Sequence, residues 1–289
     1  MQAQANFTSA TAANGSINPN WDFATVWRMY DGYTYPLLKG FMTPVTVTAN
    51  DAAKIYDTLA YSGGNGITCS NGACGLLLGS VGYGGSAQGA VHAGSYTISA
   101  SGLYSNQQGY DIGYANGTLT VNPASLAVTG VTANNKVYDT TANATLSGTA
   151  TVTALGSDVV TVTGSGSGAF ADKNVANGKA VTVSGFGLGG ADAGNYTVVQ
   201  PVGVTANITP ASLAVTGVTA NNKVYDTTAN ATLSGTASVT ALGGDTVTVS
   251  GSGSGLFADK NVANGKAVTV TGFGLGGADA GNYTVVQPV

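Results

Sequence analysis

The sequence predicts an all-β protein built from tandem sandwich modules. Three observations support this prediction: a strand-forming composition, short alternating runs bounded by turn residues, and an internal repeat. Of the 289 residues 44 are glycine, and all thirteen acidic residues are aspartate. Residues that favour helices are scarce, whereas Val, Thr and Tyr, which favour strands, are abundant. Hydrophobic residues make up 43% of the chain, which is enough to form folded cores.

The repeat is nearly exact. The segment PASLAVTGVTANNKVYDTTANATLSGTA begins at Pro123 and recurs from Pro210, 87 residues later. A more distant copy, NDAAKIYDTLAYSG, lies at residues 50–63. Repeats of this length indicate an array of similar structural units. We divide the chain into residues 1–43, the end of a β-solenoid or linker; 44–123, a first module; 124–210, a first repeat; and 211–289, a second repeat.

Each repeat is expected to contain about seven short strands. The segments SLAVTGVTA, DVVTVTG, KAVTVSGFG and NYTVVQPV alternate apolar and polar residues, and Gly, Asn and Asp separate them. The second repeat has no counterpart of GVTANITP at 203–210, so we expect it to lack its last strand. Matching Tyr56 and Tyr96 to Tyr138 and Tyr196 makes the first module about 18 residues shorter, or two short strands.

A tyrosine that follows small residues recurs three times. Asp192-Ala-Gly194-Asn-Tyr196 and Asp279-Ala-Gly281-Asn-Tyr283 are identical, and His92-Ala-Gly-Ser-Tyr96 is a looser copy. In immunoglobulin-like sandwiches a tyrosine near the start of the penultimate strand hydrogen-bonds to the backbone just upstream. We therefore predict a structural tyrosine corner in each module and immunoglobulin-like sandwiches overall, although a β-grasp fold also suits the first module.

Charge and hydropathy argue against two classes of partner. The net charge is −4, so the chain has no basic surface for nucleic acid. No apolar run reaches the roughly 20 residues of a membrane helix, and the first residues, Met1-Gln-Ala-Gln, lack the pattern of a signal peptide. We expect a segment that does not insert into membranes and that comes from a longer protein.

Cys69 and Cys74 flank the turn-forming tetrapeptide Ser-Asn-Gly-Ala, which suits a small disulfide loop. A pair of free thiols is the alternative. A zinc site is not expected, because it would need two further ligands. We expect no catalytic residue, cofactor or metal. His92 is the only histidine, and GFGLGG at 185–190 is not followed by room for a helix.

Several of these segments carry a family resemblance. KVYDTTANATLSGTA, FADKNVANGKAVTV and GADAGNYTVVQP resemble the YDG repeats of large bacterial surface adhesins. VTVTANDAAKIYD and YANGTLTVNP resemble the accompanying MBG domains, and WDFATVWRMYDGYTYPLLKG is similar to the end of the β-helix in filamentous-haemagglutinin-type adhesins. The usual Tyr-Asp-Gly-Thr-Thr appears here as Tyr138-Asp139-Thr140-Thr141, without the glycine that suits a turn with positive φ.

The resemblance implies a non-catalytic stalk and adhesion region on the surface of a Gram-negative bacterium. The implied partners are a glycan or protein of the host cell or matrix, the adhesin itself, and an outer-membrane secretion partner for the parent protein. A second hypothesis is a dedicated glycan- or protein-binding module that uses exposed loops of the first module, where GLYSNQQGYDIGY at 102–114 is rich in tyrosine. An exposed aromatic cluster outside the corner tyrosines would favour this second hypothesis.

Overall fold

The computed structural model describes residues 22–288, and the protein is all-β in this range apart from short 3-10 turns. The chain forms two compact units. The first comprises the residues up to Leu126 together with Thr153–Val160 and Gly189–Thr197. The second comprises Ala127–Val152, Thr161–Leu188 and the residues from Val198 onward. No helix among the described residues is long and apolar enough to cross a bilayer.

Half of the predicted solenoid or linker segment, residues 1–21, lies outside the described residues. The remainder forms a short antiparallel pair, β1 (Trp27–Arg28) with β2 (Leu37–Leu38), followed by the 3-10 turn η2 (Lys39–Phe41). Tyr30, Leu37 and Met42 from this segment are buried in the core of the first module. The Tyr30 hydroxyl donates to the carbonyl oxygen of Tyr110 at 2.6 Å.

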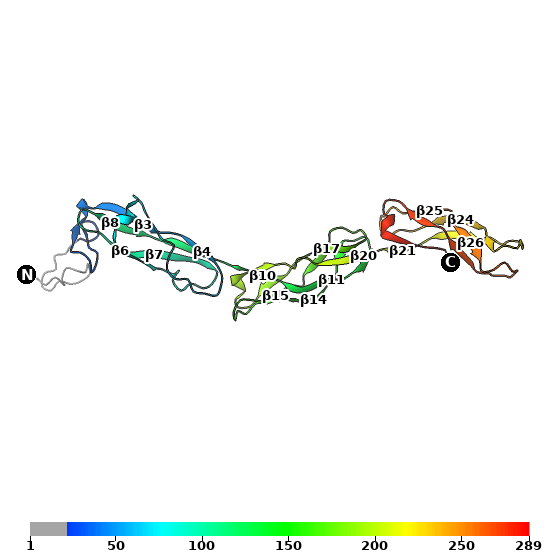
Figure 1. Cartoon of the computed structure of the whole chain (residues 1–289), viewed down its shortest axis with the longest axis horizontal. Coiled ribbons are helices and arrows are strands. Elements are labelled where there is room, and N and C mark those ends of the chain that lie inside the picture. Colours follow the sequence, from blue (N-terminus) through cyan, green and yellow to red (C-terminus); the bar gives the residue numbers. More distant parts are fainter. Residues whose placement is uncertain (1–21, 289) are drawn as a thin grey trace, which may run out of the picture. The chain divides into compact units, whose positions relative to one another are not determined.

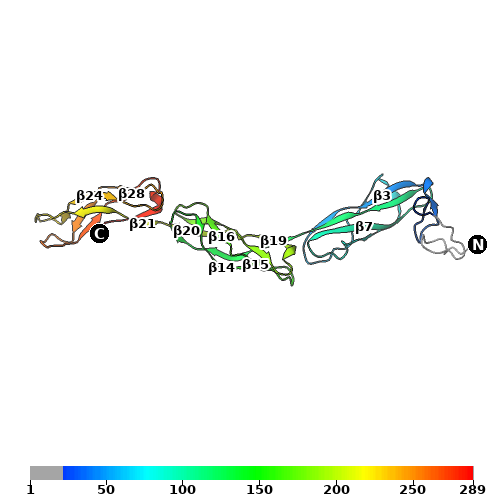
Figure 2. The same ribbon diagram turned by 180° about the vertical axis from the view of Figure 1, so that it is seen from behind.

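The first module contains two sheets that Figures 1 and 2 show as two layers. One has the order β5-β3-β8 and consists of β3 (Thr43–Ala49), β5 (Ile67–Cys69) and β8 (Tyr110–Ala115). The other has the order β4-β9-β7-β6 and consists of β4 (Ala52–Ile55), β6 (Leu78–Gly84), β7 (Gly94–Tyr104) and β9 (Gly117–Asn122). Strand β3 pairs parallel with β8, and β4 pairs parallel with β9.

Alternation of side chains builds this core. Along β9 the buried residues are Gly117, Leu119 and Val121, and the threonines and asparagine between them are exposed. Val47 and Ile98 are fully buried from the strands β3 and β7. Because successive residues of a strand point to opposite faces, each strand supplies one row of apolar side chains to the interior.

The first repeat has many short strands. They are β10 (Ala124–Ala127), β11 (Thr129–Ala133), β12 (Lys136–Val137), β13 (Asn143–Ala144), β14 (Leu146–Thr151), β15 (Thr161–Thr163), β16 (Ser167–Phe170), β17 (Ala176–Ser184), β18 (Gly187–Gly189), β19 (Tyr196–Val199) and β20 (Thr205–Thr209). Five of them form a sheet of order β12-β20-β17-β16-β13, and the others pair as β10-β19, β11-β14 and β15-β18. In Figure 1 β17 and β20 lie above β11 and β14, and their apolar side chains form one core.

The second repeat uses β21 (Ala211–Ala214), β22 (Thr216–Ala220), β23 (Asn230–Ala231), β24 (Leu233–Ser238), β25 (Thr248–Ser250), β26 (Ser254–Phe257), β27 (Val268–Thr271), β28 (Gly274–Gly276) and β29 (Tyr283–Val286). The pairs β21-β29, β22-β24 and β25-β28 reproduce those of the first repeat. The five-stranded sheet, in contrast, is reduced to β23-β26-β27. Within the described residues no strand takes the place of β12 or β20.

Two glycines show why the repeats need this residue at a bulge. Gly130 and Gly148 both have positive φ, +80° and +87°, where β11 and β14 change register. A Cβ atom at Gly148 would lie 2.2 Å from the carbonyl oxygen of Gly130. Any other residue at position 148 would therefore push the two strands apart.

The turn after Tyr138 keeps its positive φ although it has no glycine. Thr140 has φ +68°, and its equivalents Thr58 and Thr227 have φ +67° and +70°. The Asp139 carboxylate accepts hydrogen bonds from the Thr141 amide at 2.9 Å and hydroxyl at 2.8 Å. These bonds hold the turn in a conformation that β-branched residues disfavour.

Candidate functional site

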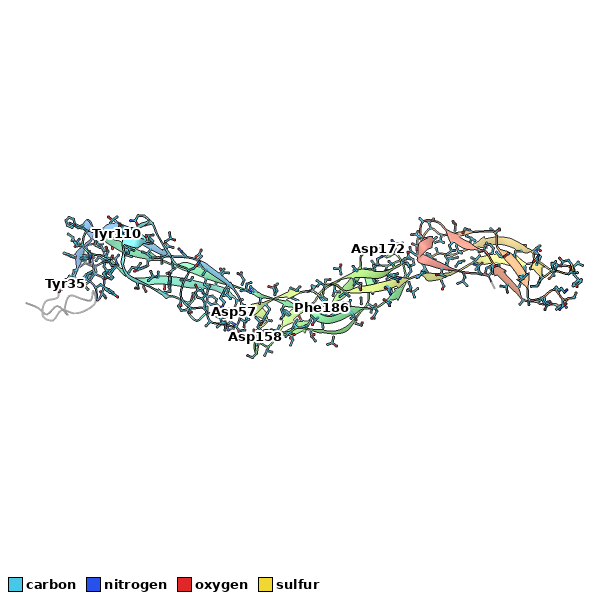
Figure 3. The ribbon with its side chains drawn as sticks, viewed as in Figure 1. Tyr35, Asp57, Tyr110, Asp158, Asp172 and Phe186 are labelled. Atoms are coloured by element: carbon cyan, nitrogen blue, oxygen red, sulfur yellow. A yellow bond between two sulfur atoms is a disulfide. The ribbon has the colours of Figure 1, made fainter. Side chains whose placement is uncertain are left out.

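The first candidate site is a Tyr–Asp–Tyr cluster in the first unit. Tyr56 directly follows β4, and Tyr196 begins β19. Both hydroxyls donate to the same carboxylate oxygen, Oδ2 of Asp158, at 2.7 Å each. The two rings meet edge to face with their centroids 5.4 Å apart. Figure 3 labels Asp158 close to Asp57, the residue that follows Tyr56 in the sequence.

The second unit contains the same arrangement, in which the first tyrosine recurs after 82 residues and the aspartate and the second tyrosine recur after 87. Tyr138 directly follows β12, and Tyr283 begins β29. Their hydroxyls donate to Oδ2 of Asp245 at 2.6 Å and 2.8 Å, and their ring centroids are also 5.4 Å apart. In both clusters the later tyrosine accepts a hydrogen bond from a backbone amide, that of Leu155 or Leu242. We call the two groups the first and second clusters.

A buried asparagine beside each cluster adds a second contact. Asn195 and Asn282 are both buried, in the 3-10 turns η4 (Ala193–Asn195) and η5 (Ala280–Asn282). The Oδ1 atom of Asn195 accepts from the Ala93 amide at 2.9 Å, and Oδ1 of Asn282 accepts from the Val175 amide at the same distance. Each amide side chain thus satisfies a backbone group in the loop before β7 or β17.

The second cluster also includes a lysine. Lys173 donates to Oδ1 of Asp245 at 2.6 Å, and its ammonium lies 5.8 Å from the centre of the Tyr138 ring. Asp245 therefore accepts three charge-assisted or strong hydrogen bonds while its side chain is 3% exposed. In the first cluster His92 occupies the corresponding loop, and its Nδ1 lies 3.2 Å from Nδ2 of Asn195.

The electrostatics favour charged aspartates and neutral tyrosines. Hydrogen bonds from Tyr196 and Tyr56 lower the pKa of Asp158. Hydrogen bonds from Lys173 and Tyr138 lower the pKa of Asp245 to about 2. Burial, followed by the bond to the aspartate, raises the pKa of Tyr56 and Tyr283 above the usual value of a phenol. At neutral pH each carboxylate is charged and accepts hydrogen bonds from hydroxyls that stay protonated, and the arrangement holds chain segments together.

One copy of the earlier tyrosine has no such partners. Tyr225 is the equivalent of Tyr138 in the second repeat, but it is 51% exposed whereas Tyr138 is 2% exposed. Val262, the equivalent of Val175, is 85% exposed. Among residues 22–288 nothing covers this end of the second repeat, so Tyr225 is an internal control for the two clusters.

The comparison with known protein families bears directly on these repeats. The family described as YDG domain matches residues 122–204 and 209–289, which together make up more than half of the chain. The chain belongs to the YDG domain family. Its first and second repeats are therefore two YDG domains, and each cluster contains the corner tyrosine of one of them. No curated protein and no solved structure matches the chain.

The predicted corner tyrosines of the YDG domains have different hydrogen-bond partners from those expected. Tyr196 and Tyr283 donate to aspartates 38 residues upstream, not to a nearby backbone carbonyl. Asp192 and Asp279 stabilise the loop by accepting from the amides of Val159 and Thr246 at 2.8 Å. For Gly194 and Gly281 a Cβ atom would meet nothing within 4 Å, so neither glycine is sterically required.

The looser copy in the first module lies on a different strand. Tyr96 belongs to β7, which pairs antiparallel with β9. The equivalent pair in the first YDG domain is β17 with β20, and Tyr196 lies in neither of these strands. The counterpart of Tyr196 is instead Tyr110, which begins β8. The expectation that the first module is about 18 residues shorter was wrong, because Tyr110 lies 54 residues after Tyr56, close to the 58 between Tyr138 and Tyr196. Tyr96 does bond back upstream, to the carbonyl oxygen of His92 at 2.9 Å.

The two cysteines lie in the first module, away from the clusters. Cys69 ends β5 and Cys74 lies in the 3-10 turn η3 (Ala73–Leu76); they form a disulfide across a Cα distance of 5.5 Å. Among the described residues no group of three or more His, Cys, Asp or Glu side chains converges as a metal site would require.

Sequence reasoning missed the roles of Tyr56, Tyr138, Asp158 and Asp245. The tyrosines are visible in the shared Lys-[Ile/Val]-Tyr-Asp-Thr motif, and the two aspartates recur at matched positions. A signal that would have joined them is the recurrence itself, because the first two Tyr-Asp-Thr motifs are each followed by an aspartate just over 100 residues later, in the next sequence repeat.

Proposed function

We propose that the chain is a non-catalytic stalk and adhesion region of a secreted bacterial surface adhesin of the filamentous-haemagglutinin type. In this proposal residues 44–123 form an MBG-like module, and the parent protein reaches the exterior of a Gram-negative outer membrane through a secretion partner. The stalk presents its binding surfaces to a glycan or protein of the host or matrix, or to other copies of the adhesin.

The observation that carries this proposal is the repetition of the Tyr–Asp–Tyr cluster in successive sequence repeats. Each cluster ties the motif Lys-[Ile/Val]-Tyr-Asp-Thr of one sequence unit to the corner tyrosine of the next. A stalk must transmit force along the chain, and buried charge-assisted hydrogen bonds that join successive sequence repeats serve this purpose. Two nearly identical YDG domains also suit a repetitive support better than a unique pocket would.

Mechanical unfolding of single molecules tests the stalk proposal. When the chain is pulled from both ends, we expect separate force peaks for individual units, and unfolding of one YDG domain should release roughly 300 Å at about 3.5 Å per residue. The substitution Asp245→Asn should lower the force of the peaks that involve the second cluster. A chain that extends without resolved peaks would contradict a load-bearing role.

Cell-surface labelling tests the location. An antibody against this chain should label intact cells of the source bacterium, and external protease should remove the signal without breaking the cells. Labelling only after the cells are opened would refute a surface adhesin and leave the mechanical result untouched.

A binding role for the first module has its own supporting observation. Tyr33 is 61% exposed and stacks on Tyr104 with the ring centroids 4.3 Å apart. Tyr35 and Phe41 are also exposed, and Figure 3 labels Tyr35 in this segment. Exposed aromatic faces outside the clusters are the feature that favours glycan or protein recognition.

A glycan array probed with the chain tests this second candidate. Wild-type protein should bind a subset of glycans, and Tyr33→Ala should abolish that binding, whereas Tyr225→Ala, an exposed tyrosine in the second YDG domain, should not change it. Equal binding by both variants would argue against recognition by this aromatic group.

A further inference from the structure

The first module contains two segments that run side by side in the same direction. Residues 43–55, which we call the entry segment, contain β3 and β4, and residues 110–122, the exit segment, contain β8 and β9. Strand β3 pairs parallel with β8, as Figure 1 shows, and β4 pairs parallel with β9. The sequence separation between paired residues is identical in the two ladders, from the pair Thr43 and Tyr110 onward. The two segments therefore keep one register while both cross from one sheet to the other.

Hydrogen bonds close this double ladder at both ends. The Thr43 amide donates to the carbonyl oxygen of Gly109 at 2.8 Å, and the Tyr56 amide donates to that of Asn122 at the same distance. Tyr56 is also the first tyrosine of the first cluster, where its hydroxyl donates to Asp158. The cluster thus lies at the end of the ladder where the exit segment ends.

The ladder is also bridged at the point where both segments change sheets. A Cβ atom at Gly117 would lie 2.3 Å from the carbonyl oxygen of Ala49, so only glycine allows the segments to approach this closely. Beside it Oδ1 of Asp51 accepts the Thr118 amide at 2.7 Å. The carboxylate therefore supplies an acceptor where the backbone ladder is interrupted between β3 and β4.

The YDG domains repeat the parallel pairing. In the first, β10 pairs with β19, and β12 pairs parallel with β20, with Lys136 opposite Ile208. In the second, β21 pairs parallel with β29 at the same sequence separation, with Ala211 opposite Tyr283. Pro123 alone separates β9 from β10, so the exit segment of the first module continues directly into the first strand of the first YDG domain.

The parallel strands also contain most of the deeply buried side chains. The largest fully buried side chains among the described residues are Val47, Ile98, Ile112, Leu119, Val121 and Ile208. All of them except Ile98 belong to β3, β8, β9 or β20. Water competes for backbone hydrogen bonds, and its exclusion strengthens the bonds that remain. The ladders between these strands are therefore the best protected of the fold.

We propose that the first module and the first YDG domain are mechanical clamps, in which the parallel segments carry tension and the strands between them carry none. This proposal rests on the stalk function proposed above. Tension along the chain pulls the entry segment at its beginning and the exit segment at its end. Because the two segments are parallel, they are forced to slide along each other. The hydrogen bonds of a parallel pair are evenly spaced, so sliding loads all of them at once.

A clamp of this kind separates mechanical support from binding. In the first module the strands β5, β6 and β7 lie between the entry and exit segments in the sequence. The disulfide between Cys69 and Cys74 also lies there. These parts stay free of tension until the ladder breaks, so their loops can contact a partner without being deformed by the load.

The direction of pulling tests the clamp in the intact chain. Handles at Gly40 and Asn122 make the two segments slide, whereas handles at Gly40 and Gln108 peel their adjacent ends apart. All three positions are exposed, and a Cβ atom at Gly40 would meet nothing within 4 Å, so azide-bearing residues can carry the handles. In single-molecule force measurements at one loading rate, sliding should require at least about twofold more force, because peeling opens one hydrogen bond at a time. Equal forces, or a larger force for peeling, would overturn the proposal.

Substitutions at Asp51 test whether the ladder carries the force. Asp51→Ala removes the acceptor of the Thr118 amide and should lower the sliding force, whereas Asp51→Asn keeps an oxygen in place and should retain most of it. Neither substitution should change the peeling force, because peeling first breaks the bond of the Thr43 amide. Equal sliding forces for wild type and both variants would contradict the clamp. That result would leave the stalk proposal standing, because resolved unfolding peaks and surface labelling do not depend on which strands carry the tension.

Discussion

Tyr138→Phe measures the contribution of one hydroxyl to the second cluster. The substitution keeps the ring, and therefore its edge-to-face contact with Tyr283 and its contact with Lys173. It removes only the hydrogen bond to Asp245, which is 2.6 Å long. A hydrogen bond to a charged group contributes about 1.5–3 kcal/mol. Since Asp245 keeps Lys173 and Tyr283 as donors, no buried charge is left unpaired, and we expect a loss of about 1.5–2 kcal/mol.

Hydrogen exchange followed by mass spectrometry resolves this effect better than a bulk unfolding curve, because a chain of several modules does not unfold in one two-state transition. A loss of about 1.5–2 kcal/mol corresponds to exchange roughly 10- to 30-fold faster in β17 and β20, the strands that pack around Tyr138. Exchange in the first module provides an internal reference.

The matched control is Tyr225→Phe. Tyr225 stands at the equivalent position, but its hydroxyl has no hydrogen-bond partner among the described residues and the side chain is half exposed. Its substitution should change exchange by less than about twofold, as expected for a surface site. If the two variants behave alike, the hydroxyl of Tyr138 contributes nothing, and the structural role that we assign to the clusters is refuted.

Three further predictions follow from the same structure. The pKa of Asp245 falls to about 2, below the value of about 4 in an unfolded chain, so the stabilisation by its charge is complete above about pH 5 and is lost between about pH 4 and 2. The stability advantage of wild type over Asp245→Asn should therefore shrink over that range in thermal unfolding scans. Thr140→Gly should raise the stability of the first YDG domain by about 0.5–1 kcal/mol, because glycine tolerates φ +68°. Thr141→Gly should lower it, because the hydroxyl that donates to Asp139 is lost. A loss of stability in both variants would mean that the turn is not strained. Alkylation of Cys69 and Cys74 should require prior reduction, as intact mass can show, and labelling without a reductant would contradict the disulfide.

The strands could be predicted from sequence because their signal is local. Runs such as KAVTVSGFG alternate apolar and polar residues, and the glycines between runs mark the turns, so an all-β array follows from neighbouring residues alone. The near-exact repeat fixes the equivalence of the two YDG domains in the same way. Their pairs β11-β14 and β22-β24 accordingly have the same register, including the shift at the bulge.

The clusters could not be predicted in this way, because their partners are distant in the sequence. Tyr138 and Asp245 are 107 residues apart, and no local pattern near either residue indicates the other. The same limit explains the misplaced copy at His92–Tyr96. A few small residues before a tyrosine describe the start of β7 as well as that of β19, and only strand pairing distinguishes them.

The turn at Thr140 shows a different limit. A missing glycine argues against positive φ when residues are considered singly. The hydrogen bonds from Thr141 to Asp139, and from Lys136 to the carbonyl oxygen and hydroxyl of Thr141, nevertheless hold the backbone in place. Their combined contribution outweighs a steric preference of about 1–2 kcal/mol.

Each cluster takes one tyrosine from one sequence unit and the aspartate and second tyrosine from the next. Excision of residues 123–209, one full period, would therefore bring Tyr56 opposite Asp245 and Tyr283 and rebuild the same three-residue contact. Duplication of a period would likewise create an additional contact of the same kind. Recombination between the nearly identical stretches of the gene can thus change the number of YDG domains while each new boundary between repeats forms its cluster at once. The length of such a protein can therefore vary between generations without any new contact having to evolve.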